Sequence, residues 1–165
     1  MRAERYHHCP SRRLVMRAAL AAVAASGVGG CAPGADSGPV EIKWDRDVCA
    51  HCGMAISDRR FAAQVRGGPR RAVHKFDDIG CAIVWLERQP WRGEPATEIW
   101  VAAHDSGRGL DARAARYLAG RTSPMGYNHA AYEPGGPGGV DFTQARAAIL
   151  ALESKARARA AGAGP

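Results

Sequence analysis

Four side chains that could bind a metal or take part in redox chemistry occur within six residues of the segment DVCAHCGMAISDRRFAAQ (47–64). They are Cys49, His51, Cys52 and Met54. Thiolate, imidazole and thioether groups are metal ligands, and a Cys-x-x-Cys pair can also form a disulfide or act as a redox dithiol. The function of the chain depends on which of these chemistries the segment performs.

Three interpretations of the pair have partial support. A structural zinc site usually takes four Cys or His ligands, often from two Cys-x-x-Cys pairs. Here there is one such pair; Cys81 and a histidine could complete a set, although no spacing requires it. Thioredoxin-like chemistry needs the pair at a helix N-terminus, whereas Gly53 and the residues after it indicate a turn into a strand. A Cys49–Cys52 disulfide would close a very small loop and stabilise the fold little.

A soft-metal site is the fourth interpretation. Cu(I) prefers thiolate and thioether sulfur. Cys52 and Met54 are two residues apart, so in an extended segment their side chains lie on the same face. Cys49 could join them through the turn. Met125, in the segment TSPMGY (122–127), lies in a predicted turn and is the candidate for a further sulfur donor; a place in the core is the alternative for it.

The first thirty residues have the features of a bacterial export signal. Five Arg and one Glu surround or precede the apolar run AALAAVAASGV (18–28), which is too short to span a bilayer. Cys31 follows Val-Gly-Gly, as in a lipobox, and SRRLVMR (11–17) resembles a twin-arginine signal. We therefore expect residues 1–30 to be removed and Cys31 to be lipidated, which anchors the protein to a membrane without spanning it. An ordinary secretory signal is the alternative.

The distribution of charge argues against a nucleic-acid-binding protein. The chain has a formal net charge of +7. The excess lies in the leader and in residues 155–165, and residues 31–154 hold equal numbers of basic and acidic side chains. No net basic surface remains there to follow a phosphate backbone.

The cysteine count adds a constraint on the mature chain. Without Cys9 of the leader and the lipidated Cys31, the thiols are those of Cys49, Cys52 and Cys81. Outside the cytoplasm thiols tend to form disulfides, and an odd number cannot all pair within one chain. At least one of the three therefore needs another explanation.

The elements that position these groups follow an α+β pattern. Strands are predicted at 40–44, 61–65, 71–76, 98–104, 115–120 and 128–133, with 61–65 and 71–76 forming a hairpin. A helix is predicted at 77–90, with Asp77 as N-cap and Pro90 closing the segment. A second is predicted at 140–160, with Asp141 and Gln144 forming a capping box. Both halves then consist of strands followed by a helix, which indicates a weak internal duplication.

These elements define the expected domain organisation. Residues 31–39 are expected to be a flexible tether, 40–154 a single globular domain, and 155–165 a basic, alanine-rich tail that frays from the helix after Leu152. The last helix is predicted to pack through one face, which consists of Phe142, Ala145, Ile149 and Leu152.

Three motifs follow the lipobox in order: CAHCGMAI (49–56), KFDDIGCAIVWL (75–86) and SPMGY (123–127). Together they resemble the NosL family of copper-binding lipoproteins, which assist the maturation of nitrous oxide reductase. The resemblance covers about residues 40–142. It implies a Cu(I) chaperone in the periplasm rather than an enzyme, with nitrous oxide reductase and its ABC-type maturation complex as partners. It also implies a fold similar to that of the organomercury lyase MerB, with duplicated small α+β units.

Carried over by position, the resemblance makes Cys52 and Met54 the first candidates for copper ligands. Met125 and then Cys49 follow. His129, in YNHAAY (127–132), could supply a nitrogen donor. A thiol–disulfide oxidoreductase that uses Cys49 and Cys52 is the first alternative function, and a mercury-handling protein, which rests on fold analogy alone, is the second.

Three residues near these motifs are expected to have structural roles. Cys81 lies among apolar residues of the predicted helix and is expected to be a buried structural thiol. Asp77 and Asp78 are expected to be a helix cap and a surface or fold-fixing residue rather than an acid–base pair.

Overall fold

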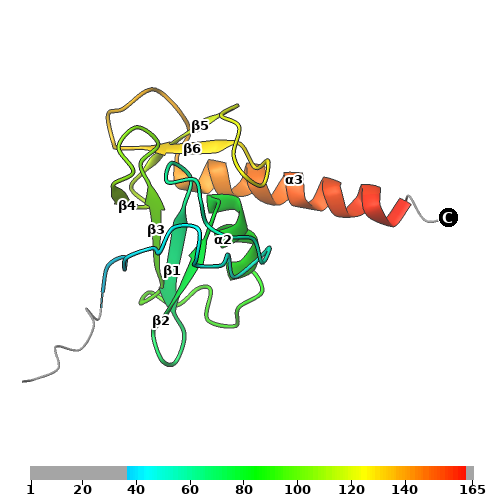
Figure 1. Ribbon diagram of the computed structural model, residues 1–165. Coiled ribbons are helices and arrows are strands. Elements are labelled where there is room, and N and C mark those ends of the chain that lie inside the picture. The colour runs from blue at the N-terminus through cyan, green and yellow to red at the C-terminus, as the bar shows by residue number, and fades with distance from the viewer. Residues whose placement is uncertain (1–36, 163–165) are drawn as a thin grey trace, which may run out of the picture. The chain divides into compact units, whose positions relative to one another are not determined.

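The computed structural model describes residues 37–162, which form an α+β domain of antiparallel sheets and two helices. The elements in chain order are β1 (Ala63–Gly67), β2 (Ala72–Phe76), α2 (Ile79–Leu86), β3 (Glu98–Ala102), β4 (Gly109–Asp111), β5 (Arg116–Ala119), β6 (His129–Tyr132) and α3 (Phe142–Gly162). Figure 1 shows their arrangement. The predicted fold class is confirmed at this level. The leader and Cys31 lie outside the described residues.

The larger sheet has the strand order β2-β1-β3-β4, and all its neighbours are antiparallel. The predicted hairpin is confirmed, since β1 and β2 pair from Ala63 with Phe76 to Gly67 with Ala72. One of its two interior strands, β1, is buried along its whole length. The short edge strand β4 had no predicted counterpart.

The smaller sheet consists of β5 and β6, and both strands were predicted. They pair antiparallel from Arg116 with Tyr132 to Ala119 with His129. A parallel bridge between Ala103 and Ala131 connects this sheet to the chain just after β3. The segment between the two strands, 120–128, contains Met125.

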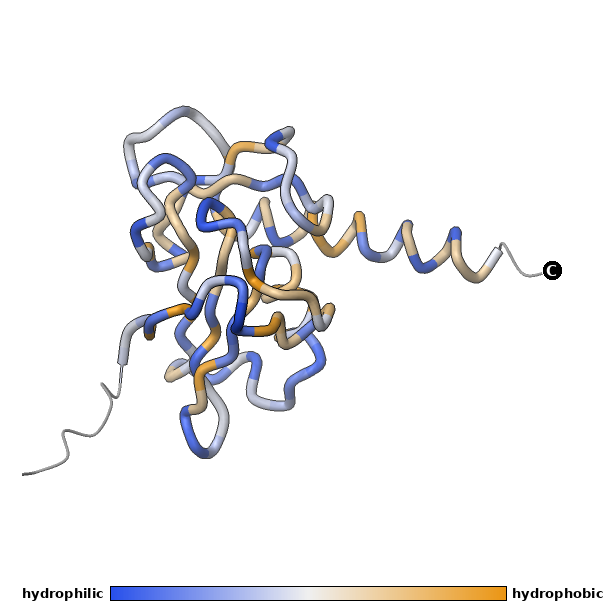
Figure 2. Tube along the Cα trace, in the orientation of Figure 1, coloured by the Kyte–Doolittle hydropathy of each residue, from blue (hydrophilic) through white to orange (hydrophobic). Residues whose placement is uncertain are grey.

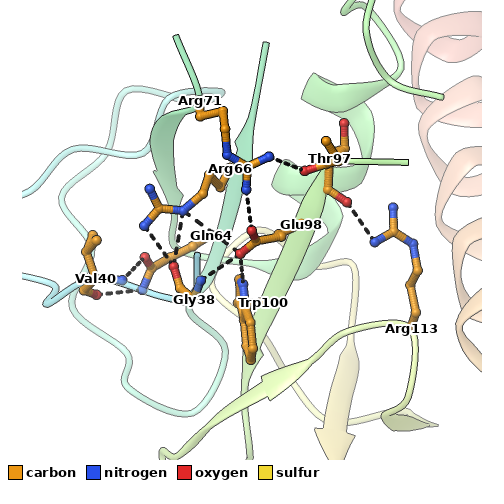
Figure 3. Close-up of polar contacts among 10 residues, drawn as sticks. Gly38, Val40, Gln64, Arg66, Arg71, Thr97, Glu98, Trp100 and Arg113 are labelled. Carbon is orange, nitrogen blue, oxygen red and sulfur yellow. Dashed lines mark hydrogen bonds and ion pairs between the residues drawn. The ribbon is translucent and has the colours of Figure 1, made fainter. Parts of the chain in front are cut away.

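The strand predicted at 40–44 is wrong. Val40 pairs with the side-chain amide of Gln64 instead of a backbone: its N–H donates to Oε1 at 2.9 Å and its carbonyl accepts from Nε2 at 2.9 Å. Gly38 is held in the same way, because its N–H donates to Glu98 at 2.7 Å and its carbonyl accepts from Arg66. Figure 3 shows these contacts beside β1 and β3. The backbone N–H and C=O groups of this segment are therefore hydrogen-bonded to side chains, and they do not form the backbone-to-backbone hydrogen bonds of a β-strand.

The same close-up shows how a charged network is tolerated in the sheet (Figure 3). Arg66 is buried on β1 and lies 3.9 Å from the carboxylate of Glu98 on β3. Arg71 reaches the other oxygen of Glu98 at 2.5 Å, and Trp100 donates to that carboxylate as well. A buried charge costs free energy unless it is paired and hydrogen-bonded, and this network pairs it.

Helix α2 is buried on nearly all sides. Its N-cap is Asp78, whose carboxylate accepts from Gly80 N–H at 2.8 Å, so the prediction of Asp77 as cap is wrong by one residue. Of the two roles expected for the other carboxyl, a surface position is wrong and a fold-fixing position remains, since both carboxyls are buried. The helix ends at Leu86, before Pro90, and packs against β1, β2 and α3.

Helix α3 begins with the predicted capping box. Gln144 N–H donates to Asp141 Oδ1 at 2.8 Å, and Asp141 N–H donates to Gln144 Oε1 at 3.2 Å. Ala145 and Ile149 are buried, but Leu152 is 43% exposed, so the predicted apolar face ends earlier than expected. The helix then continues to Gly162 rather than fraying after Leu152.

The C-terminal half of α3 extends past the sheets (Figure 1). Figure 2 shows its last turns alternating between hydrophilic residues and weakly hydrophobic ones. Alanine and arginine have high helix propensity, which accounts for a helix that continues where packing has ended. Within the part of the chain that the structure describes, no helix combines the length and the apolar character needed to cross a bilayer.

Candidate metal centre

A tight loop between Asp47 and Ile56 presents Cys49 and Cys52. Val48 and Ala55 form an antiparallel bridge, and inside it Cys49 N–H donates to the carbonyl of Met54 at 2.8 Å. Gly53 has a φ of +77°, a left-handed conformation that glycine adopts without strain, and its N–H donates to Cys49 O at 3.0 Å. The loop thus turns Cys49 and Cys52 toward the same side.

One backbone hydrogen bond fixes this loop on the sheet. Ala50 N–H donates to the carbonyl of Lys75 on β2 at 2.9 Å. Lys75 also forms an ion pair with Asp47 at 2.5 Å, at the start of the loop. The loop therefore lies against the end of β2, where the chain passes through Asp77 into α2.

Three cysteines and one aspartate meet at this point. The Sγ atoms of Cys49, Cys52 and Cys81 and a carboxylate oxygen of Asp77 all lie within 4.8 Å of one another. Asp77 stands between β2 and the N-cap of α2, and Cys81 lies in the first turn of that helix. Four donors at this spacing could hold one metal ion.

Three members of the group are closed to solvent and one is not. Cys49 and Cys81 are buried at 1% and 0% exposure and Asp77 at 2%, whereas Cys52 is half-buried. Cys52 Sγ lies 3.7 Å from Asp77 Oδ1 and 3.8 Å from Oδ2. The centre therefore has an inner wall of two thiols and a carboxyl, and an outer thiol through which solvent or another molecule can approach.

The protonation of the group is strongly biased. The hydrogen bond with Cys81 lowers the pKa of Cys49, and the same contact raises that of Cys81. Burial raises the pKa of Cys52 to about 11 and that of Asp77 to about 6, and the charge of Cys49 acts in the same direction on both. These shifts favour a state in which the thiol of Cys49 is ionised and the thiols of Cys52 and Cys81 are protonated. Binding of a cation would release the remaining protons.

The context of the Cys-x-x-Cys pair is not that of a thioredoxin-like site. Cys49 and Cys52 lie in the bridged loop, and the described cysteines are all free thiols. The helix that begins nearby contributes Cys81 instead. In thioredoxin-like sites the N-terminus of a helix lowers the pKa of the first cysteine, and Cys49 and Cys52 do not lie at such a position.

The two predicted thioether ligands differ in their surroundings. Met54 lies in the same loop as the cysteines and is 54% exposed. Met125 is half-buried and packs against the main core, as its alternative interpretation required. Its backbone N–H points at Asp78, 3.4 Å from Oδ2, so its loop is fastened to the residue next to Asp77.

His129 does not belong to the group of close donors. It is buried on β6, and its Nδ1 lies 2.6 Å from the carbonyl of Tyr127. His51 is half-buried in the cysteine loop, and its pKa is lowered by burial and then by the charge of Arg88. Among the described histidines, cysteines and acids, the close group consists of the three cysteines and Asp77 alone.

The predicted copper ligands did not include Cys81 or Asp77, and Cys81 was considered as a ligand only for zinc. The burial expected of Cys81 is confirmed, but its thiol faces the other two. One signal in the sequence indicated this: the odd number of thiols, at least one of which needed another explanation.

Comparison of the chain with models of known protein families and with curated proteins gave no match. The site is therefore defined by its geometry.

Proposed function

We propose that this domain binds one Cu(I) ion and passes it to another protein outside the cytoplasm. The observation behind the proposal is the convergence of three cysteine sulfurs within 4.8 Å, two of them buried and one half-buried. Thiolates are soft ligands, and Cu(I) is one of the metals that soft sulfur ligands select. Cys49, Cys52 and Cys81 are the proposed ligands.

The open side of the centre supports transfer rather than permanent storage. Cys52 is accessible at the rim, and the thioether of Met54 lies at the surface in the same loop. An incoming ligand can attack a metal at such a rim while the buried thiols still hold it. Met54 and Met125 are proposed as additional sulfur donors, one from the surface and one from the loop attached to Asp78.

Asp77 fits the proposal as a proton acceptor more than as a ligand. Cu(I) disfavours a hard carboxylate, but the thiol of Cys52 lies within 3.8 Å of both carboxylate oxygens. Thiols must lose their protons to bind a metal, and a neighbouring carboxylate gives the proton of Cys52 a destination.

The same carboxylate favours a second candidate function, a zinc site. Zn²⁺ is bound by cysteine sulfur and by aspartate oxygen, and structural zinc sites have four ligands. A set of three cysteines and Asp77 satisfies that number. In this alternative the ion would stabilise the fold, and no transfer would take place.

The resemblance to the NosL family extends the proposal to partners and location. The order β1-β2-α2, then β3 and β4 of the same sheet, and then β5-β6-α3 supports the MerB-like arrangement of two strand-and-helix units that the resemblance implies. On this basis we propose a lipid-anchored protein that faces the periplasm. It delivers copper, without acting as an enzyme, to nitrous oxide reductase through the ABC-type maturation complex.

The test is an anaerobic titration of the full chain, kept reduced, with Cu(I) in the presence of a strong competing chelator. A parallel titration uses Zn²⁺ and a zinc chelator. The proposal predicts one Cu(I) per chain, held against the chelator, and no displacement by a tenfold excess of Zn²⁺. Binding of Zn²⁺ that resists Cu(I) would support the zinc alternative. Binding of neither metal, with disulfide-reducing activity toward insulin, would support the thiol–disulfide oxidoreductase.

A further inference from the structure

A groove of about 510 Å³ lies between the Met125 loop and the C-terminal half of α3. Met125 and Tyr127 line one side of it and Leu152 the other. Leu152 is one of the few large apolar side chains of the described chain that solvent reaches, at 43% exposure. An exposed apolar surface in a concave place is typical of a binding site.

The rim of this groove is basic. Lys155 and Arg159 line it and lie four residues apart on α3, so they face the same side of the helix. The one acid of the groove, Glu153, is already engaged: it pairs with Arg157 at 2.8 Å and accepts from the hydroxyl of Tyr127 at 3.0 Å. Within residues 37–162, neither Lys155 nor Arg159 forms an ion pair. Two uncompensated positive charges thus border an apolar floor.

The floor of the groove is attached to the metal centre. The ring of Tyr127 lies so close to Gly80 that a Cβ at that position would overlap it, and Gly80 precedes Cys81. Met125 N–H lies 3.4 Å from the carboxylate of Asp78, which follows Asp77. A ligand in the groove would therefore contact the Met125 loop. This loop is bonded to the start of α2, which supplies two of the four metal donors, Asp77 and Cys81.

We propose that this groove receives a segment of the metal-accepting protein, and that the segment presents an apolar side chain flanked by carboxylates. This inference rests on the proposed function for the identity of the partner as an acceptor. Its chemistry comes from complementarity alone: Leu152 and Met125 offer an apolar contact, and Lys155 and Arg159, both on the α3 side of the groove, offer ion pairs. An anionic membrane surface would use the two charges but would leave the recessed apolar floor unfilled.

The test is a titration of the isotope-labelled full chain, reduced and metal-free, followed by NMR. The probes are the blocked peptide Glu-Asp-Leu-Glu-Asp, its neutral analogue Gln-Asn-Leu-Gln-Asn, and Glu-Asp-Gly-Glu-Asp, which lacks the apolar side chain. We expect the first to shift the amide signals of Gly126, Leu152 and Ala156 in a saturable way. Each analogue should bind at least fivefold more weakly.

The variant that tests the rim is Lys155→Glu with Arg159→Glu, and its charge-matched control is Arg46→Glu with Arg70→Glu, two exposed positions away from the groove. The rim variant should weaken peptide binding at least tenfold and the control less than twofold. Equal weakening by both, or shifts that lie elsewhere, would overturn the proposal. A third result would also overturn it: the peptides fail to bind, whereas vesicles of anionic lipid bind the parent and not the rim variant. That result would assign the surface to lipid headgroups.

The same titrations separate this inference from the proposed function. Cu(I) binding is measured on the parent and on the rim variant, and it should be unchanged because neither Lys155 nor Arg159 belongs to the close group of donors. Peptide binding by a parent that fails to bind Cu(I) would contradict the proposed function and leave the docking groove standing. Cu(I) binding without peptide binding would contradict the groove alone.

Discussion

Cys52 Sγ lies 3.7 Å from Asp77 Oδ1, although 25 residues separate the two along the chain. The contact exists because the bridged cysteine loop is bonded to the end of β2 through Ala50 and Lys75. The chain leaves β2 at Phe76, so Asp77 is the first residue that can face the loop. The centre thus forms where one loop and one strand-to-helix junction meet, and each half contributes two of the four donors.

The most informative single change is Cys81→Ser, because the sequence favoured a structural role for Cys81 and did not place it among the copper ligands. Serine keeps nearly the same shape but offers a hard oxygen that Cu(I) disfavours. We expect Cu(I) affinity, measured by chelator competition, to fall at least tenfold, which corresponds to about 1.4 kcal/mol. Ala82→Ser is the matched control, since it adds a hydroxyl to the next buried position of α2 without removing sulfur. If Cys81→Ser binds Cu(I) with the affinity of the parent, Cys81 is not a ligand and has only a structural role in the core.

Asp77 gives the metal-free protein a definite pH dependence. Burial raises its pKa from 3.8 to about 6, and the hydrogen bond and charge of Cys49 add to the shift. A carboxyl whose pKa is higher in the folded state favours folding below its unfolded pKa, and this contribution is lost as pH rises through the folded pKa. At pH 7 the ionised group therefore costs up to about 3 kcal/mol, at 1.36 kcal/mol per pKa unit.

The variant Asp77→Asn removes that cost. Its thermal unfolding, followed by circular dichroism without metal, should show a higher Tm than the parent at pH 7 and a similar Tm near pH 4. Asp78, whose pKa burial also raises, keeps part of the pH dependence in both proteins. Asp105→Asn, at an exposed position, is the control and should leave Tm unchanged at both pH values. A Tm for Asp77→Asn below that of the parent at pH 7 would contradict the assigned protonation.

Asp78 joins α2 to the Met125 loop. Its carboxylate accepts from Gly80 N–H at 2.8 Å and from the hydroxyl of Ser123 at 2.5 Å, and Met125 N–H lies 3.4 Å away. Asp78→Ala removes a helix cap, which costs about 0.5–2 kcal/mol, and leaves a buried hydroxyl without its acceptor, which costs about 1–3 kcal/mol more.

Urea unfolding at neutral pH measures this difference against a second cap. Asp141→Ala removes the exposed cap of α3 and should cost about 0.5–2 kcal/mol. The free energy of unfolding should fall by at least about 1 kcal/mol more in Asp78→Ala than in Asp141→Ala, because the cost of an unpaired buried group is added. Asp78→Asn, which keeps an acceptor oxygen, should fall between the parent and Asp78→Ala. Equal losses in the two alanine variants would show that Asp78 acts only as a cap.

Met125 and Met54 are tested by the same substitution, to leucine, which keeps volume and removes sulfur. Met125→Leu should cost less than about 1.5 kcal/mol of stability because the change nearly conserves volume in the core. Met54→Leu should change stability by less than about 0.5 kcal/mol because the side chain is exposed. If both thioethers bind the ion, each variant should hold Cu(I) about tenfold more weakly. If Met125→Leu lowers the Tm and leaves the Cu(I) affinity unchanged, Met125 is a packing residue of the core and not a ligand.

The local elements were predictable because short-range patterns determine them. Two short strand-like segments, 61–65 and 71–76, on either side of the turn at Gly67 and Gly68 predict the hairpin, and Asp141 with Gln144 predicts the start of α3. The strand predicted at 40–44 failed because the partner of Val40 is the side chain of Gln64, which no pattern along the chain reveals.

The metal centre was predictable only in part for a related reason. The spacing of Cys49 and Cys52 indicates metal binding or redox chemistry, but the approach of this pair to Cys81 depends on the hydrogen bond from Ala50 to Lys75 that places the loop on the sheet. Helical periodicity places Cys81 on an apolar helix and gives no indication of what covers it. The odd number of thiols was the available sign that a third sulfur needed a role.

The central claim is that three cysteine sulfurs converge on one Cu(I) ion. X-ray absorption at the copper edge, on the full chain loaded anaerobically with one equivalent of Cu(I), measures the number and kind of ligands directly. We predict a first shell of at least three sulfur donors in the parent, and a shell with one sulfur fewer in Cys81→Ser. A parent shell of two sulfurs that is unchanged in Cys81→Ser, or a shell dominated by nitrogen and oxygen, would contradict the assignment.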